Sequence, residues 1–74
     1  MIKYRLDFKE PSWEWDQTTP CQYYSALDDA KKAMHRAIEV AGQRFKNFRI
    51  YEQKAHGHWL MVGEFDFEQP ENSN

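Results

Sequence analysis

The segment from residue 25 to residue 42, SALDDAKKAMHRAIEVAG, decides the fold because it predicts one amphipathic helix. Its apolar residues recur every three or four positions, the spacing that gathers side chains on one side of an α-helix. Ser25 and Asp28 can cap the start, and Gly42 is a residue type that commonly ends a helix. The charged residues fall on the opposite side. We therefore expect the core to form against the apolar side of this helix.

Three strands are predicted around the helix. Residues 2–9 alternate apolar and charged side chains. Residues 48–53 predict a second strand, in which Phe48, Ile50 and Glu52 lie on one side and Arg49, Tyr51 and Gln53 on the other. Residues 54–58 contain a glycine and predict a hairpin turn that leads into a third strand, residues 59–67. In this third strand Trp59, Met61, Phe65 and Phe67 lie on one side, while Leu60 and Val62 make the other side apolar as well.

A strand that is apolar on both faces usually has neighbours on both sides. The predicted fold is therefore α+β with the order β-α-β-β, one helix packed on a three-stranded, mainly antiparallel sheet. The preferred strand order is 1-3-2, with the third strand between the other two. The order with the second strand in the middle remains open.

The chain has 74 residues, the size of one small domain. We expect residues 1–68 to form this α+β domain and residues 69–74 to be a flexible polar tail. A core of this size leaves a stability margin of about 3–5 kcal/mol, so burial against a partner would add stability. The net charge is -2, from ten basic and twelve acidic residues, which gives no general attraction to polyanions.

The single cysteine, Cys21, excludes an internal disulfide and suits a reducing compartment. The first ten residues, MIKYRLDFKE, carry neither a secretory signal nor a membrane span. We therefore expect a cytoplasmic protein that makes no contact with membranes.

Residues 10–24 show neither the helical spacing of three to four residues nor the strand alternation of two, and they predict an unusually long loop. The aromatic residues of this loop are Trp13, Trp15, Tyr23 and Tyr24. If exposed, they form a cluster of four rings of the types that are enriched among binding hot spots. If buried against the helix or the sheet edge, they extend the core instead, and the sequence leaves both interpretations open.

The helix can cover only one face of the sheet. The open face is predicted to have an apolar centre at Tyr51, Leu60 and Val62 and a charged rim, which is typical of an association surface. Alternatively, the long loop folds back and shields this centre. The first hypothesis is a protein-binding surface for another protein, or for a homo-oligomer. Its predicted residues are Trp13, Trp15, Tyr23, Tyr24, Tyr51, Leu60 and Val62.

The alternative hypothesis is binding of single-stranded nucleic acid, RNA in particular, on the same face. Several RNA-binding modules clamp and stack single strands on a basic sheet that carries an aromatic residue. The residues that would do so here are Lys3, Arg5, Lys9, Arg49 and Tyr51. Asp7 and Glu64 on the same face, together with the negative net charge, weigh against this alternative.

No catalytic residue, metal site or cofactor is predicted. A triad built from Cys21, His35 and Asp28 is not favoured, because His35 lies on the solvent side of the helix. His56 and His58 surround a turn glycine, and a stable zinc site needs three or four converging ligands. A glycine-rich phosphate loop is absent from the sequence. We therefore expect a protein that is not an enzyme.

In general character, this short, aromatic-rich β-α-β-β chain with a capped helix, a hairpin and a polar tail resembles the small accessory proteins encoded by bacteriophages. Many of those proteins bind and block a host protein. The resemblance implies a stoichiometric binder, acting as an inhibitor of a host enzyme or defence complex without catalysis of its own. It supplies no functional residues.

Overall fold

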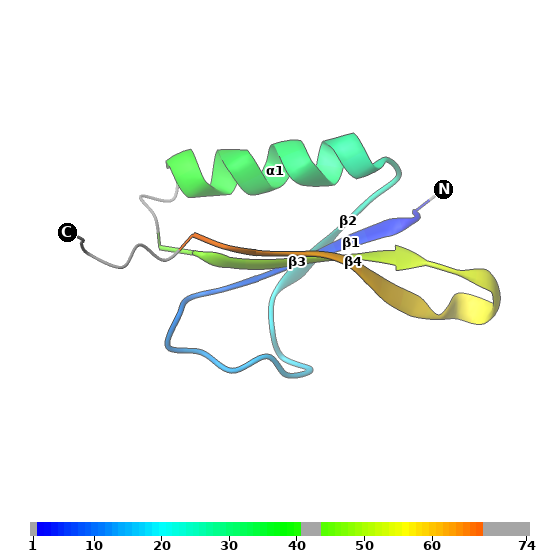
Figure 1. Ribbon diagram of the computed structural model, residues 1–74, viewed down its shortest axis with the longest axis horizontal. Coiled ribbons are helices and arrows are strands. Elements are labelled where there is room, and N and C mark those ends of the chain that lie inside the picture. The colour runs from blue at the N-terminus through cyan, green and yellow to red at the C-terminus, as the bar shows by residue number, and fades with distance from the viewer. Residues whose placement is uncertain (1, 41–43, 68–74) are drawn as a thin grey trace.

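The computed structural model shows an α+β domain in which one helix covers one face of a four-stranded antiparallel sheet (Figure 1). The structure describes residues 2–40 and 44–67. The predicted tail, residues 69–74, and the predicted helix end at Gly42 lie outside the described residues. The elements follow the chain as β1 (Tyr4–Lys9), β2 (Cys21–Tyr24), α1 (Leu27–Val40), β3 (Asn47–Gln53), the 3-10 turn η1 (Ala55–Gly57) and β4 (Trp59–Asp66).

The α+β class and the single amphipathic helix are confirmed, but the prediction of three strands is wrong. The segment Cys21–Tyr24, predicted as loop, forms β2 and pairs antiparallel with β1, with Tyr4 opposite Tyr24. The segment CQYY gives no strand signal because it does not alternate polar and apolar residues, and its neighbouring tyrosines occupy opposite faces. The fold is therefore β-β-α-β-β.

The preferred strand order is also wrong. The sheet order is β2-β1-β3-β4, so β3 lies beside β1 and the last strand, β4, lies at an edge. Apolar residues on both faces of β4 predicted a central position, but many of them are exposed at the edge instead. The helix connects β2 to β3, which lie on either side of β1.

The core lies between α1 and the sheet. Leu6, Phe48 and Ile50 point from the sheet toward Ala30 and Met34 of the helix, and all five are at most 2% exposed. The register explains this, because Ile50 pairs with Leu6 on the neighbouring strand and side chains two apart in a strand share a face. Full burial of one large apolar side chain contributes about 1.5–3 kcal/mol. The helix begins at Leu27 rather than directly after Ser25.

The loop from residue 10 to residue 20 passes on the side of the sheet opposite α1 (Figure 1). It is closed locally, because the Asp16 carboxylate accepts hydrogen bonds from the backbone N–H and the hydroxyl of Thr18, at 2.8 and 2.6 Å. These hydrogen bonds lower the pKa of the Asp16 carboxyl. The loop thus covers one end of the sheet face that the helix leaves open.

Candidate functional site

The uncovered end of the open face carries a cluster of rings around an arginine. The register places Tyr23 of β2, Arg5 of β1 and Tyr51 of β3 next to one another. The Arg5 guanidinium carbon lies 4.4 Å from the ring centre of Tyr51 and 5.3 Å from that of Trp59. The rings of Tyr23 and Trp59 lie 6.0 Å apart, centre to centre. We call Arg5, Tyr23, Tyr51 and Trp59 the arginine–aromatic cluster.

A β-bulge in β4 brings Trp59 to this face. Ile50 pairs with Gly63, whereas the next residue of β3, Tyr51, pairs with Met61, so that Val62 is an extra residue without a partner in the register. One extra residue reverses the alternation of side chains along the rest of the strand. Met61 therefore shares the open face with Tyr51.

The bulge contradicts the predicted division of the last strand into two faces. Phe65 and Phe67 pack against the core as predicted, but Trp59 and Met61 lie on the opposite face. Leu60 was predicted on the open face and lies on the helix side, because it pairs with Glu52, two residues after Ile50 in β3. The sequence does carry a signal for the bulge, since a glycine inside a strand often marks one.

The edge strand β4 exposes three consecutive apolar side chains. Leu60 is 55% exposed, and Met61 and Val62 are each 44% exposed. No strand of the described residues lies beside the outer edge of β4, so its outward N–H and C=O groups face solvent. Long edge strands with exposed apolar residues readily pair with another chain. Met61 was not predicted as a site residue.

Two cations predicted for nucleic-acid binding are held by acidic side chains. Arg5 Nε lies 2.8 Å from Asp7 Oδ1, and Arg49 Nε lies 3.0 Å from Glu64 Oε2. Burial raises the pKa of the Asp7 carboxyl, and the neighbouring Arg5 and Arg49 only partly offset this effect. A phosphate group would have to compete with these carboxylates for both guanidinium groups.

The two predicted lysines are also engaged. Lys3 Nζ lies 3.4 Å from a carboxylate oxygen of Glu52. Lys9 is buried, and its Nζ donates to the backbone carbonyl of Glu10 at 3.3 Å. The structure thus brings the predicted basic residues and Tyr51 to the sheet but leaves each cation with a partner.

The predicted cluster of four rings in the loop is divided among different contacts. Trp13 packs edge-on against Phe45 with ring centres 6.0 Å apart. The ring centre of Trp15 lies 4.3 Å from the guanidinium carbon of Arg49, on the open face of the sheet. Both tryptophans are half-buried. Both tryptophans therefore hold the loop against the rest of the domain, and part of each ring remains exposed.

The two predicted tyrosines point to opposite faces because they are neighbours in β2. Tyr23 is 51% exposed in the arginine–aromatic cluster, and its hydroxyl accepts a long hydrogen bond from the Cys21 thiol, with Sγ 3.7 Å from the oxygen. Tyr24 faces the helix side and donates to Gln22 Oε1 at 2.6 Å. Only Tyr23 shares a face with Tyr51.

Within residues 2–40 and 44–67, no three side chains of histidine, cysteine, aspartate or glutamate lie together as they would around a metal ion. The helix in this part of the chain is too short and too polar to cross a membrane. Comparison with protein-family models, with curated proteins and with solved structures finds no match to this chain.

Proposed function

We propose that this protein is a non-enzymatic protein-binding module that uses the edge of β4 and the adjacent arginine–aromatic cluster. The observation that carries the proposal is the exposure of Leu60, Met61 and Val62 in a row on an edge strand. A surface of this composition gains free energy, about 25 cal/mol per Å² of apolar area, when a partner covers it. A small domain can obtain part of its stability in this way.

The mode of binding follows from the geometry of an edge strand. A strand of the partner adds to β4, so that backbone hydrogen bonds supply affinity and alternate side chains supply specificity. Trp59 and Met61 then contact the partner on the open face, and Leu60 contacts it on the helix side. Tyr23 and Trp59, rings of the type enriched in hot spots, extend the contact.

The partner is proposed to be a host enzyme or a component of a defence complex, which the protein blocks as a stoichiometric inhibitor. This part of the proposal rests on the general resemblance to phage accessory proteins. The lone cysteine suits a reducing compartment, so we expect the partner to be cytoplasmic. A second copy of the chain is the other partner to be tested, since the edge of β4 can also pair with itself.

The alternative function is binding of single-stranded RNA through Arg5, Arg49 and Tyr51. The rings of the arginine–aromatic cluster favour it, because bases stack on exposed aromatic side chains. The ion pairs of Arg5 with Asp7 and of Arg49 with Glu64 weigh against it, since they neutralise the cations that phosphates would need.

An affinity pull-down from host lysate with the tagged full chain tests the proposal. The lysate is divided, and one half is treated with nuclease. Val62→Asp is compared with Ile2→Asp, a matched control because Ile2 is 53% exposed and lies outside the proposed surface. Circular dichroism verifies that both variants are folded.

We expect one host protein to be retained after nuclease treatment, lost with Val62→Asp and kept with Ile2→Asp. If retention disappears with nuclease and with high salt, the RNA alternative is correct and the proposal is wrong. Sedimentation velocity of the purified chain distinguishes a second copy from a different protein, because only self-association makes the sedimentation coefficient rise with concentration.

A further inference from the structure

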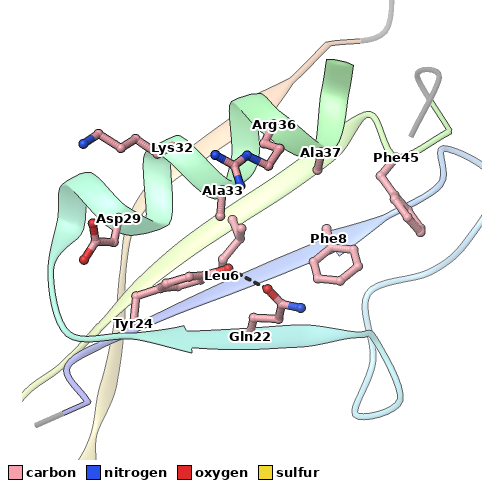
Figure 2. Close-up of a pocket in the computed structure, with 10 residues that line it drawn as sticks. All are labelled: Leu6, Phe8, Gln22, Tyr24, Asp29, Lys32, Ala33, Arg36, Ala37 and Phe45. Carbon is pink, nitrogen blue, oxygen red and sulfur yellow. Dashed lines mark hydrogen bonds between the residues drawn. The ribbon is translucent and has the colours of Figure 1, made fainter. Parts of the chain in front are cut away.

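A cleft lies between α1 and the strands β1 and β2, on the face opposite the arginine–aromatic cluster (Figure 2). Its volume is about 650 Å³, within the range of about 300–1,000 Å³ that is typical of ligand sites. The cleft takes no part in the function proposed above. It therefore offers a second, separate binding surface.

The cleft exists because small residues of the helix face large residues of the sheet. Ala33 and Ala37 lie one turn apart on α1 and leave a hollow that larger side chains would fill. The floor is apolar and is formed by Leu6, Phe8 and Phe45, and the rings of the two phenylalanines lie 5.0 Å apart. One large apolar side chain can therefore be buried in this hollow.

Two cations stand at the rim of the cleft on the helix (Figure 2). Lys32 and Arg36 are both exposed, and neither forms an ion pair with any described residue. They differ in this from Arg5 and Arg49 on the open face, each of which has an acidic partner. One carboxylate, that of Asp29, lies on the same rim, one turn before Lys32. The unpaired cations favour an occupant with negative charge.

The rim on the sheet side is the free edge of β2. Phe8 N donates to the carbonyl of Pro20 at 3.1 Å, and Lys3 N donates to that of Tyr24 at 3.0 Å, so these carbonyls face β1. Because backbone groups alternate in direction along a strand, the N–H and C=O groups of Cys21 and Tyr23 face away from β1. Among the described residues, β2 is the last strand of the sheet on this side. An extended peptide can pair with it there.

We propose that the cleft binds an extended acidic peptide segment of a partner protein, which adds to the free edge of β2. The segment places one apolar side chain between Ala33 and Ala37 and the sheet, and acidic side chains two residues to either side reach Lys32 and Arg36. The two acidic side chains are four residues apart in the strand and are therefore separated by about 13 Å. Lys32 and Arg36 are separated by about 6 Å along the helix axis, and their long, exposed side chains can extend in opposite directions to span the difference.

The test is an NMR titration of the ¹⁵N-labelled full chain with synthetic peptides. The probes are four peptides of the form acetyl-Ser-Glu-Ser-X-Ser-Glu-Ser-amide, with leucine, methionine, phenylalanine or tryptophan at X. Control peptides have lysine in place of both glutamates, or serine at X. Decanoate is titrated separately, because a small amphipathic anion could also use an apolar cleft with cations at its rim.

We expect at least one acidic peptide to cause saturable shifts at the amides of Cys21, Tyr23, Ala33 and Ala37. Both control peptides bind about tenfold more weakly, and added salt weakens binding of the acidic peptide. Saturable shifts at these amides also distinguish the cleft from the β4 surface.

Variants of the cleft test each element of the proposal. Combined Lys32→Glu and Arg36→Glu weakens binding about tenfold, whereas Lys31→Glu, a matched change at an exposed position outside the cleft lining, changes it less than about twofold. Ala37→Leu fills the hollow and abolishes binding while preserving helix propensity. Cys21→Pro removes an outward N–H and weakens binding, whereas Cys21→Ala does not.

The proposal is overturned if none of the four acidic peptides gives saturable shifts at these amides, or if lysine and glutamate peptides bind equally. Decanoate binding without peptide binding would make the cleft a site for small amphipathic anions instead. Val62→Asp leaves peptide binding unchanged, so a failure here is distinguishable from a failure of the proposed β4 interface.

Discussion

Trp15→Leu tests whether a cation–π contact holds the long loop on the sheet. The ring centre of Trp15 lies 4.3 Å from the guanidinium carbon of Arg49 and 5.3 Å from Lys9 Nζ. Arg49 is in turn oriented by Glu64, whose carboxylate oxygen lies 3.0 Å from Arg49 Nε. Leucine retains an apolar side chain but removes the π-system. The variant thus isolates the part of the contact that depends on the ring.

The expected magnitude follows from the half-buried position of the pair. A cation–π contact contributes about 0.5–1 kcal/mol at exposed sites and about 2 kcal/mol when desolvated. Trp15 and Arg49 are both half-buried, so we expect a coupling free energy of about 1 kcal/mol between them. A loss of this size lowers the melting temperature of so small a domain by about 4–8 °C.

The assay is a double-mutant cycle of Trp15→Leu and Arg49→Met, measured by urea unfolding and far-ultraviolet circular dichroism. Methionine preserves the apolar stem of the arginine. Trp13→Leu with Arg49→Met is the matched control, because Trp13 contacts Phe45 rather than a cation, and its coupling should lie within about 0.3 kcal/mol of zero. An equally small coupling for Trp15 would refute the reasoning.

Three further changes have definite expected outcomes. Phe48→Ala removes a fully buried ring at a cost of about 3–5 kcal/mol, comparable with the whole stability margin, so circular dichroism should show a largely unfolded chain. The pKa of Asp7 is raised above its ordinary value of 3.8, so the folded state binds more protons and stability falls as pH rises through the folded pKa. Asp7→Asn should flatten this fall in urea unfolding measured across a pH series. Gly63→Ala would place a Cβ 2.7 Å from the Phe65 ring, so we expect a loss of about 1–3 kcal/mol and a lower melting temperature.

The helix and the strands β1, β3 and β4 could be predicted because each has a sequence pattern that spans several residues. α1 has an apolar stripe long enough to show the helical spacing, β1 alternates over six residues, and β3 alternates over its first four residues. β2 could not be predicted in this way, since its four residues become a strand only by pairing with β1. The sequence pattern therefore identified those elements that are long enough for the pattern to be recognised.

The candidate surface was only partly predictable. Tyr51, Leu60 and Val62 were identified from alternation, and Leu60 and Val62 are exposed, but alternation placed Leu60 on the wrong face and missed Trp59 and Met61. The cause is the bulge at Val62. Because Val62 is one extra residue, the alternation of side chains that holds for residues 63–66 is reversed for residues 59–61. The ion pairs of Lys3 with Glu52 and of Arg49 with Glu64 were equally unpredictable, because they join segments far apart in the chain, whereas Arg5 and Asp7 are two residues apart in β1.

By itself, the sequence determined the α+β class, the position of the amphipathic helix and which side of it is buried, because hydrophobic periodicity acts locally along the chain. Only the tertiary structure decided the strand β2, the sheet order, the facing of Trp59 and the cleft beside α1. These features arise from pairing and packing between residues far apart in the chain. An apolar face has the same sequence pattern whether a neighbouring strand or a partner protein covers it.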